Sequence, residues 1–180
     1  MKLEEIAELV YVANSEVVGP VAAIIGGVHG NEQTGIEVAR RLKKKVESGE
    51  LAVRCTLKIA FGNPKAIVLG QRCVEKDLNR CFSHPILSGQ GMAYEDKRAR
   101  ELAGALADVT IGIDIHATNK PSAPFIACQA LPLRSDLELY KEFSAEIILA
   151  DPHMIFAGAR VTLDEFLSRV KGLLALHDRR

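Results

Sequence analysis

The sequence predicts an α/β fold, with a mixed, largely parallel sheet and helices on both of its faces. Short apolar runs alternate with longer segments of helical period along most of the chain. Such alternation is typical of sheets that helices cover on both sides. The 180 residues are enough for one ordinary domain with a core of its own, so we expect a single domain over 1–180.

The expected elements follow one another in this α/β order. The first strand is the apolar run 21–27 (VAAIIGG), which ends in glycines. A helix is expected over 34–46, where apolar residues recur at helical spacing and lysines fill the last turn. The later elements are strands at 55–61, 110–116, 125–129, 146–150 and 172–176, and helices at 94–107, 137–144 and 162–170.

Residues 62–91 interrupt this pattern. The segment shows little periodicity and is rich in Arg, Asp, Asn, His and Pro. Loops of this length in a compact domain are usually functional or disordered. We therefore expect a long loop that contributes to a functional site.

Composition excludes several classes of function. Lys+Arg and Asp+Glu both number 23, whereas proteins that neutralise nucleic-acid phosphates normally show a basic excess. The longest apolar stretch, 17–28, is too short and too interrupted by Gly and Pro to span a bilayer. It also follows an acidic start, unlike a signal peptide. We expect a cytoplasmic protein with neither a nucleic-acid nor a membrane partner; the oligomeric state stays open.

The segment 26–32 (GGVHGNE) is the first candidate site, because it follows an expected strand and precedes an expected helix. Ligands of open α/β sheets bind at such carboxyl ends of strands. His29 and Glu32 are three residues apart, so one short loop can direct an imidazole and a carboxylate, both zinc ligands, at one point. The alternative is a glycine-rich turn whose Glu favours the start of a helix.

His116 supplies the third group of this candidate site. It ends the expected strand 110–116 and shares one face with Asp114. Alone, such a histidine is more often a satisfied core or edge residue. Together with His29 and Glu32 it completes a set of two His and one Glu, which leaves one open position on a catalytic zinc.

The third candidate is Asp77-Leu78-Asn79-Arg80, with Arg72 upstream of it. A guanidinium beside an amide suits a substrate carboxylate, and a separate arginine can polarise a carbonyl near a metal. Asp77 can orient a metal-bound histidine. The alternative for this segment is a solvated polar loop.

Four motifs in order, GVHGNE (27–32), GNP (62–64), DLNR (77–80) and DIH (114–116), resemble the succinylglutamate desuccinylase/aspartoacylase family, a branch of the zinc carboxypeptidase-like hydrolases. The resemblance implies hydrolysis of the amide or ester bond of a small N-acyl amino acid or a similar carboxylate-bearing substrate by metal-activated water. It also implies one zinc per chain and assigns roles by position. The zinc ligands are His29, Glu32 and His116; Asn79 and Arg80 clamp the small anionic substrate, Arg72 polarises the scissile carbonyl, and Asp77 supports a zinc-bound histidine.

The sequence departs from the family pattern near its end. The family's proton-transferring glutamate lies on a late strand in a pattern like (T/I)-x-E-x-G, which this sequence lacks. Asp178 is the only acid near the corresponding point, so we assign it the catalytic role. The family's C-terminal β-rich domain is also expected to be absent.

Two alternatives to the hydrolase remain. One is a metal-binding but catalytically silent domain or partner subunit, which the missing glutamate favours. The other is a phosphate or nucleotide binder that uses the 26–35 loop and the start of the following helix. That loop lacks the G-x-x-x-x-G-K-[ST] lysine and the G-x-G-x-x-G spacing, and Glu32 would repel phosphate.

Overall fold

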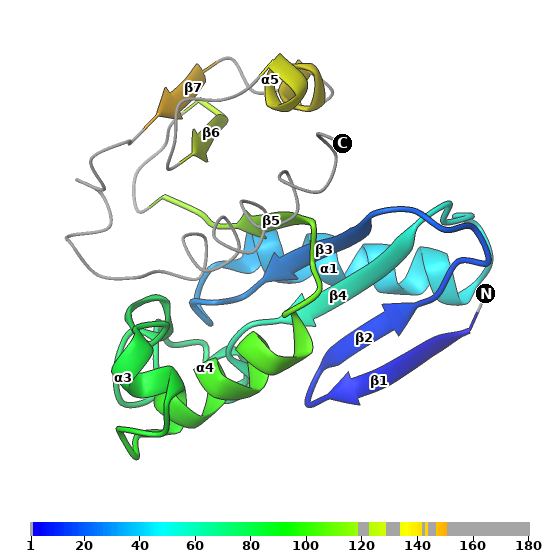
Figure 1. Cartoon of the computed structure of the whole chain (residues 1–180). Coiled ribbons are helices and arrows are strands. Elements are labelled where there is room, and N and C mark those ends of the chain that lie inside the picture. Colours follow the sequence, from blue (N-terminus) through cyan, green and yellow to red (C-terminus); the bar gives the residue numbers. More distant parts are fainter. Residues whose placement is uncertain (1, 119–122, 129–133, 142, 144–146, 151–180) are drawn as a thin grey trace. The chain divides into compact units, whose positions relative to one another are not determined.

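The computed structural model describes residues 2–118, 123–128, 134–141, 143 and 147–150. These residues form two compact units, one up to Ala117 and one from Thr118 onward. The first unit holds a five-stranded sheet and the second a two-stranded sheet (Figure 1). The expected helix at 162–170 and strand at 172–176 lie outside the described residues.

The five-stranded sheet is mixed and has the order β1-β2-β4-β3-β5. Strands β3 (Val21–Gly26), β4 (Thr56–Phe61) and β5 (Ile111–Ile115) run parallel, with β3 in the middle. Strands β1 (Leu3–Ala7) and β2 (Val10–Ala13) form a hairpin that pairs antiparallel with β4. The carboxyl ends of β3, β4 and β5 therefore share one edge of the sheet.

The β1–β2 hairpin is an element that the sequence did not predict. Its two-residue turn is Glu8-Leu9, because Ala7 pairs with Val10 across the hairpin. Leu9 takes a positive φ of 51°, a conformation that hairpin turns usually assign to Gly, Asn or Asp. A turn without these residues leaves no signal of a hairpin in the sequence.

Helices cover both faces of the sheet, as predicted (Figure 1). Helix α1 (Gln33–Glu47) buries Ile36 and Ala39 in one cluster with Leu57 and Ile59 of β4. On the opposite face, α4 (Tyr94–Ala105) buries Ala99 and Leu102 in a second cluster with residues of β3 and β4, such as Ile25 and Ala60. Alternate residues of β4 thus enter different cores, as expected for a strand covered on both sides.

The prediction of one long loop over 62–91 was wrong. This segment contains α2 (Pro64–Leu69), the 3₁₀ helix η1 (Leu78–Arg80) and α3 (His84–Leu87). Asn63 caps α2, because its side chain accepts a hydrogen bond from the Ala66 N–H at 3.1 Å. Asp77 caps η1 in the same way. Helices of three to six residues are too short to show a hydrophobic period.

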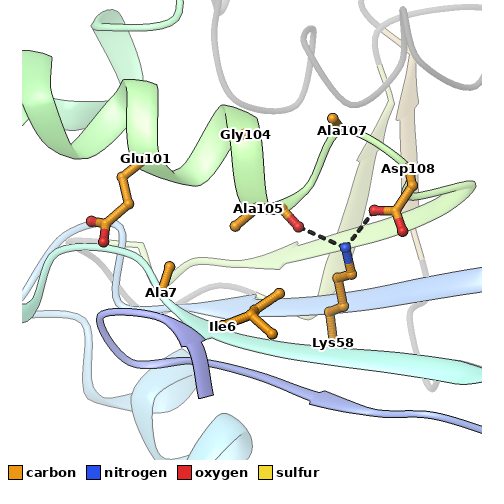
Figure 2. A pocket seen from close by; sticks show the side chains of 8 residues that line it. All are labelled: Ile6, Ala7, Lys58, Glu101, Gly104, Ala105, Ala107 and Asp108. Atoms are coloured by element: carbon orange, nitrogen blue, oxygen red, sulfur yellow. Dashed lines mark hydrogen bonds and ion pairs between the residues drawn. The ribbon is translucent and has the colours of Figure 1, made fainter. Parts of the chain in front are cut away.

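Lys58 of β4 joins the sheet to the end of α4. Its ammonium group donates to the carbonyl of Ala105 at 2.7 Å and pairs with Asp108. Figure 2 shows both contacts at the edge of an open hollow, which Ile6 and Glu101 also line. A lysine at this place satisfies a carbonyl that the end of a helix leaves without an intrahelical partner.

In the second unit, β6 (Phe125–Cys128) pairs parallel with β7 (Ile147–Ala150). Helix α5 (Arg134–Lys141) lies between them in the sequence, in place of the expected 137–144. This order of strand, helix and parallel strand agrees with the predicted alternation. In neither unit does the structure describe a helix with the length and apolar character that a membrane span needs.

Candidate metal centre

The topology of the sheet brings three predicted ligands to one edge. His29 lies in the segment between β3 and α1, and Glu32 directly precedes α1. His116 follows β5. Because β3 and β5 are parallel neighbours, with Gly26 paired to Ile115, the residues after both strands meet at the same place.

The carboxylate of Glu32 lies between the two imidazole rings. Its Oε1 is 2.7 Å from Nδ1 of His29, and its Oε2 is 3.0 Å from Nδ1 of His116. The N–H of Ala117 donates to the same Oε2 at 2.9 Å. One ligand atom from each of His29, Glu32 and His116 can be chosen so that all lie within 4.8 Å of one another. These residues could therefore hold a metal ion.

An aspartate holds the outer nitrogen of each ring. Nε2 of His29 lies 3.0 Å from Oδ1 of Asp77, and Nε2 of His116 lies 2.8 Å from Oδ2 of Asp114. A neutral ring that donates its Nε2–H to the aspartate would present the Nδ1 lone pair to a metal, so each aspartate can orient its ring as a metal ligand. Asp77 was predicted for this role. Asp114 was not, although its place on one strand face with His116 is a usable signal.

Arg72 lies beside the same carboxylates. Its guanidinium donates to Oδ2 of Asp77 at 3.0 Å, and Nη1 lies 3.7 Å from Oε1 of Glu32. The side chain is 49% exposed, so it can meet a molecule that arrives from solvent. The Arg72 carbonyl accepts from the N–H of Gly30 at 3.3 Å, which joins this segment to the His29 loop.

The other predicted site residues are placed as follows. Asn79 and Arg80 form the end of η1, directly after Asp77. The backbone N–H of Asn79 donates at 3.0 Å to Oδ1 of Asp77, the oxygen that also faces His29. Both side chains are half-buried. Asp178 lies outside the described residues.

Hydrogen bonds in the centre shift the pKa values of its acids downward. Burial raises the pKa of Glu32, but hydrogen bonds from His116, His29 and the Ala117 N–H outweigh burial and leave this pKa far below its usual range. The hydrogen bond from His29 is the largest cause that lowers the pKa of Asp77, and Arg72 adds to it. Both groups therefore stay carboxylates at neutral pH.

The imidazoles shift in the opposite direction. Burial lowers the pKa of His29, but hydrogen bonds to Asp77 and Glu32 more than offset it and leave the pKa above its usual value. Burial also lowers the pKa of His116. The charge of Asp114 and the hydrogen bonds to Asp114 and Glu32 outweigh burial and raise this pKa to about 11. The surroundings thus favour positive charge between these carboxylates.

The loop that carries His29 is tightly packed against α2. A Cβ atom on Gly30 would clash with the backbone of Ala66, and Gly27 has a φ of +72°. Glycine is the residue that meets both demands, close approach and a left-handed backbone. The glycines of GGVHGNE therefore allow His29 to lie this close to the neighbouring chain.

The comparisons with known proteins agree with this picture. Residues 18–159 match the family model of the succinylglutamate desuccinylase/aspartoacylase catalytic domain. A probable aspartoacylase from a Nostoc species is 42% identical over 102 residues, which are 53% of this chain and 34% of that protein. A succinylglutamate desuccinylase from Pseudomonas putida is 41% identical over 92 residues, 50% of this chain and 26% of that protein. The chain thus matches about a third or less of these curated relatives.

The fold is found in solved structures as well. The crystal structure of a succinylglutamate desuccinylase from Chromobacterium violaceum superposes with a TM-score of 0.72 and 24% identity. The superposition covers 93% of this chain and 55% of the other. The family match spans most of the sequence and includes His29, Glu32, Asp77 and His116. The chain belongs to the succinylglutamate desuccinylase/aspartoacylase family.

Proposed function

We propose that this chain is a zinc-dependent hydrolase that cleaves the amide or ester bond of a small N-acyl amino acid or a related carboxylate-bearing molecule. The observation that carries this proposal is the convergence of His29, Glu32 and His116 on one point, with an aspartate behind each imidazole. That arrangement brings both Nδ1 atoms and the carboxylate to one point, where one ion could replace the contacts between them.

The residues present fit zinc. Imidazole nitrogens and a carboxylate oxygen are usual zinc ligands, and three protein ligands leave a position open for a small molecule. Glu32, Asp77 and Asp114 place three carboxylates around two imidazoles and one guanidinium, a charge balance that favours a divalent cation. When bound, zinc acts as a Lewis acid and lowers the pKa of coordinated water to about 7.

The remaining residues divide the work of binding and polarisation. We assign Arg72 to polarise the scissile carbonyl, and its exposed guanidinium, which Asp77 holds beside Glu32, supports this role. Asn79 and Arg80, on η1 next to Asp77, are assigned to the substrate carboxylate. Asp178 is the group assigned to proton transfer between water and the leaving amine.

The substrate class rests on the relatives. One is named for removal of an acyl group from aspartate and the other for removal of succinate from succinylglutamate. Both names describe the cleavage of an N-acyl amino acid. The partner proposed for this chain is therefore a small anionic molecule of that class. As a separate proposal, we assign the protein to the cytoplasm.

Metal analysis of the purified protein tests the zinc site. We expect about one zinc per chain after zinc loading and removal of excess, with loss of the metal in His116→Ala. His84→Ala is the matched control, because His84 is exposed on α3, outside the cluster. A wild-type protein that folds fully and binds no zinc would contradict the proposal.

Turnover decides between the enzyme and a silent metal-binding domain. The second candidate is a metal-binding but catalytically silent domain or partner subunit, the alternative that the sequence leaves open. A panel of N-acyl amino acids is incubated with the zinc-loaded protein, and release of the free amino acid is measured. Turnover that Arg72→Ala and Asp178→Ala both abolish supports the enzyme with these roles. Zinc binding without turnover of any panel member supports the silent domain.

A further inference from the structure

Glu95, in the first turn of α4, carries a fully buried carboxylate that belongs to none of the roles assigned so far. It accepts a hydrogen bond from the side-chain amide of Asn63 at 3.1 Å. It also accepts hydrogen bonds from three backbone N–H groups, those of Val74 at 2.6 Å, Glu75 at 3.2 Å and Lys76 at 3.3 Å. A buried carboxylate is tolerated only with such a set of donors.

The three backbone groups belong to one segment without helix or strand structure. That segment, 74–76, separates Arg72 from Asp77, the two residues that contact Glu32 and His29. An irregular segment has no ladder of its own to fix its path, so its path depends on the group that binds its N–H donors. Here that group is Glu95.

Two side chains make the connection reciprocal. Oε1 of Glu75 accepts the N–H of Tyr94 at the start of α4 at 2.9 Å, and the ammonium group of Lys76 pairs with Asp96. The segment and the first turn of the helix therefore hold each other in both directions.

Asn63 connects Glu95 to the loop that carries His29 and Glu32. Its side chain donates to Glu95, while its backbone N–H donates to the carbonyl of Gly27 at 2.9 Å. Gly27 begins the loop that carries His29 and Glu32. One carboxylate thus binds the 74–76 segment directly and is joined through Asn63 to the His29 loop, the two segments that must meet for His29 and Asp77 to lie 3.0 Å apart.

We infer that Glu95 is a positioning residue for the metal centre. Its carboxylate fixes the 74–76 segment and so places Asp77 behind His29 and Arg72 beside Glu32. The inference rests on the proposed zinc site for its effect on metal binding, whereas the anchoring of the segment can be measured without metal.

Glu95→Gln removes this anchor with little change in shape. The amide keeps one acceptor oxygen but turns an NH₂ group toward the N–H groups of the segment, so part of the acceptor set is lost. In the metal-free protein we expect amide hydrogen exchange at 74–76 to accelerate about tenfold or more, with other described segments unchanged. We expect zinc affinity, measured by competition with a chromogenic chelator, to fall about tenfold, as when an outer hydrogen bond to a ligand is lost.

A double-mutant cycle with Asp77→Asn separates positioning from general destabilisation. If Glu95 acts through Asp77, Glu95→Gln has much less effect on zinc affinity once Asp77 is already Asn. Additive losses of affinity would mean that Glu95 acts on the fold as a whole and would overturn the inference. Glu101→Gln is the control, because Glu101 lies on the same helix but contacts Glu8 and Arg98 rather than the segment.

The two proposals fail in different ways. If the wild type binds no zinc, the proposed function fails, and hydrogen exchange alone decides whether Glu95 anchors the segment. If the wild type binds zinc and Glu95→Gln changes neither exchange nor affinity, the inference fails and the proposed function stands. Should Glu95→Gln not fold, Glu75→Ala replaces it, because Glu75 is exposed and alanine offers no acceptor for the Tyr94 N–H of the same connection. We expect faster exchange at 74–76 in that variant too, and unchanged exchange there would overturn the inference.

Discussion

Each imidazole of the metal centre lies between two carboxylates, and the carboxylate behind His116 is the more enclosed. The side chain of Asp114 is 1% exposed, and its Oδ1 has no hydrogen-bond partner among the described residues. Burying a charge with an unsatisfied oxygen costs free energy, which other interactions of the fold must offset. Asp114 holds Nε2 of His116, and Nδ1 of the same ring faces Glu32 in the candidate metal centre.

Asp114→Asn is therefore expected to weaken zinc binding about 10- to 100-fold, because the amide cannot replace the charge behind His116. The change is nearly isosteric, so circular dichroism should show the native fold. Chelator competition measures the affinity. Asp108→Asn is the control, since Asp108 is largely exposed and pairs with Lys58 instead. Equal affinities in the two variants would contradict the role of Asp114.

The packing of Gly30 leads to a prediction about stability. Gly30→Ala should destabilise the protein by more than about 2 kcal/mol, because its Cβ would meet the backbone of Ala66, which cannot move aside as a flexible side chain does. Gly104→Ala, within α4 and with open space around it, should stabilise by about 0.5–1 kcal/mol. Urea unfolding of both variants measures the difference. Equal effects would show that close packing at Gly30 is unimportant.

Among the elements, α4 does more than cover one face of the sheet. Besides Glu95, it contributes Arg98, whose side chain is 1% exposed. The guanidinium donates to the carbonyls of Phe61 and Gly62, both at 2.8 Å. These carbonyls lie at the end of β4, where the chain leaves the sheet beside the His29 loop. The helix therefore holds the irregular segments that surround the metal centre.

Arg98→Met should lower the free energy of unfolding by about 2–6 kcal/mol, because two buried carbonyls each lose a donor at about 1–3 kcal/mol per group. Lys97→Met, one residue earlier and exposed, should change it by less than about 0.5 kcal/mol. Denaturant titrations compare the two. If both variants were equally stable, the Arg98 contacts would contribute nothing.

The anchoring carboxylate of α4 predicts a pH dependence. Burial raises the pKa of Glu95, but the backbone and Asn63 hydrogen bonds outweigh it and leave the pKa below its usual 4.5. A carboxylate with a lowered pKa contributes stability that is present above the unfolded-state value and lost as the pH falls through the folded-state value. The stability difference between wild type and Glu95→Gln should therefore shrink below pH 4.5, as urea unfolding from pH 7 to pH 3 would show. A constant difference would contradict this.

At the scale of the whole molecule, a ligand that binds the native state alone stabilises it. Excess zinc at about 100 times its dissociation constant should add about 2.7 kcal/mol to the free energy of unfolding. The melting temperature of the wild type should rise with zinc and return on chelation, while that of His116→Ala should not move. Calorimetry of both proteins is the measurement. An equal rise in both would place the bound zinc elsewhere.

Features that depend on residues close together in the sequence could mostly be predicted, whereas features that depend on contacts between distant residues could not. The α/β alternation and the family were recognisable because they rest on local periodicity and four short motifs, and both are confirmed. The hairpin around Leu9 was missed because its turn lacks the usual residues. The contact of Glu95 with 74–76 was not predictable, since an acid in the first turn of a helix already has a local explanation in the helix dipole.

The pairing of β3 with β5 has a consequence for how the protein folds. Glu32 and His116 are 84 residues apart in sequence, and they meet only when β5 has joined the sheet. Closing such a long loop costs entropy before its contacts are gained, so we expect this pairing to form late in folding. A partly folded chain can offer the His29 and Glu32 pair but not the complete set. Tight zinc binding would thus report that the last parallel strand of the sheet is in place, which makes the metal a kinetic probe of sheet completion.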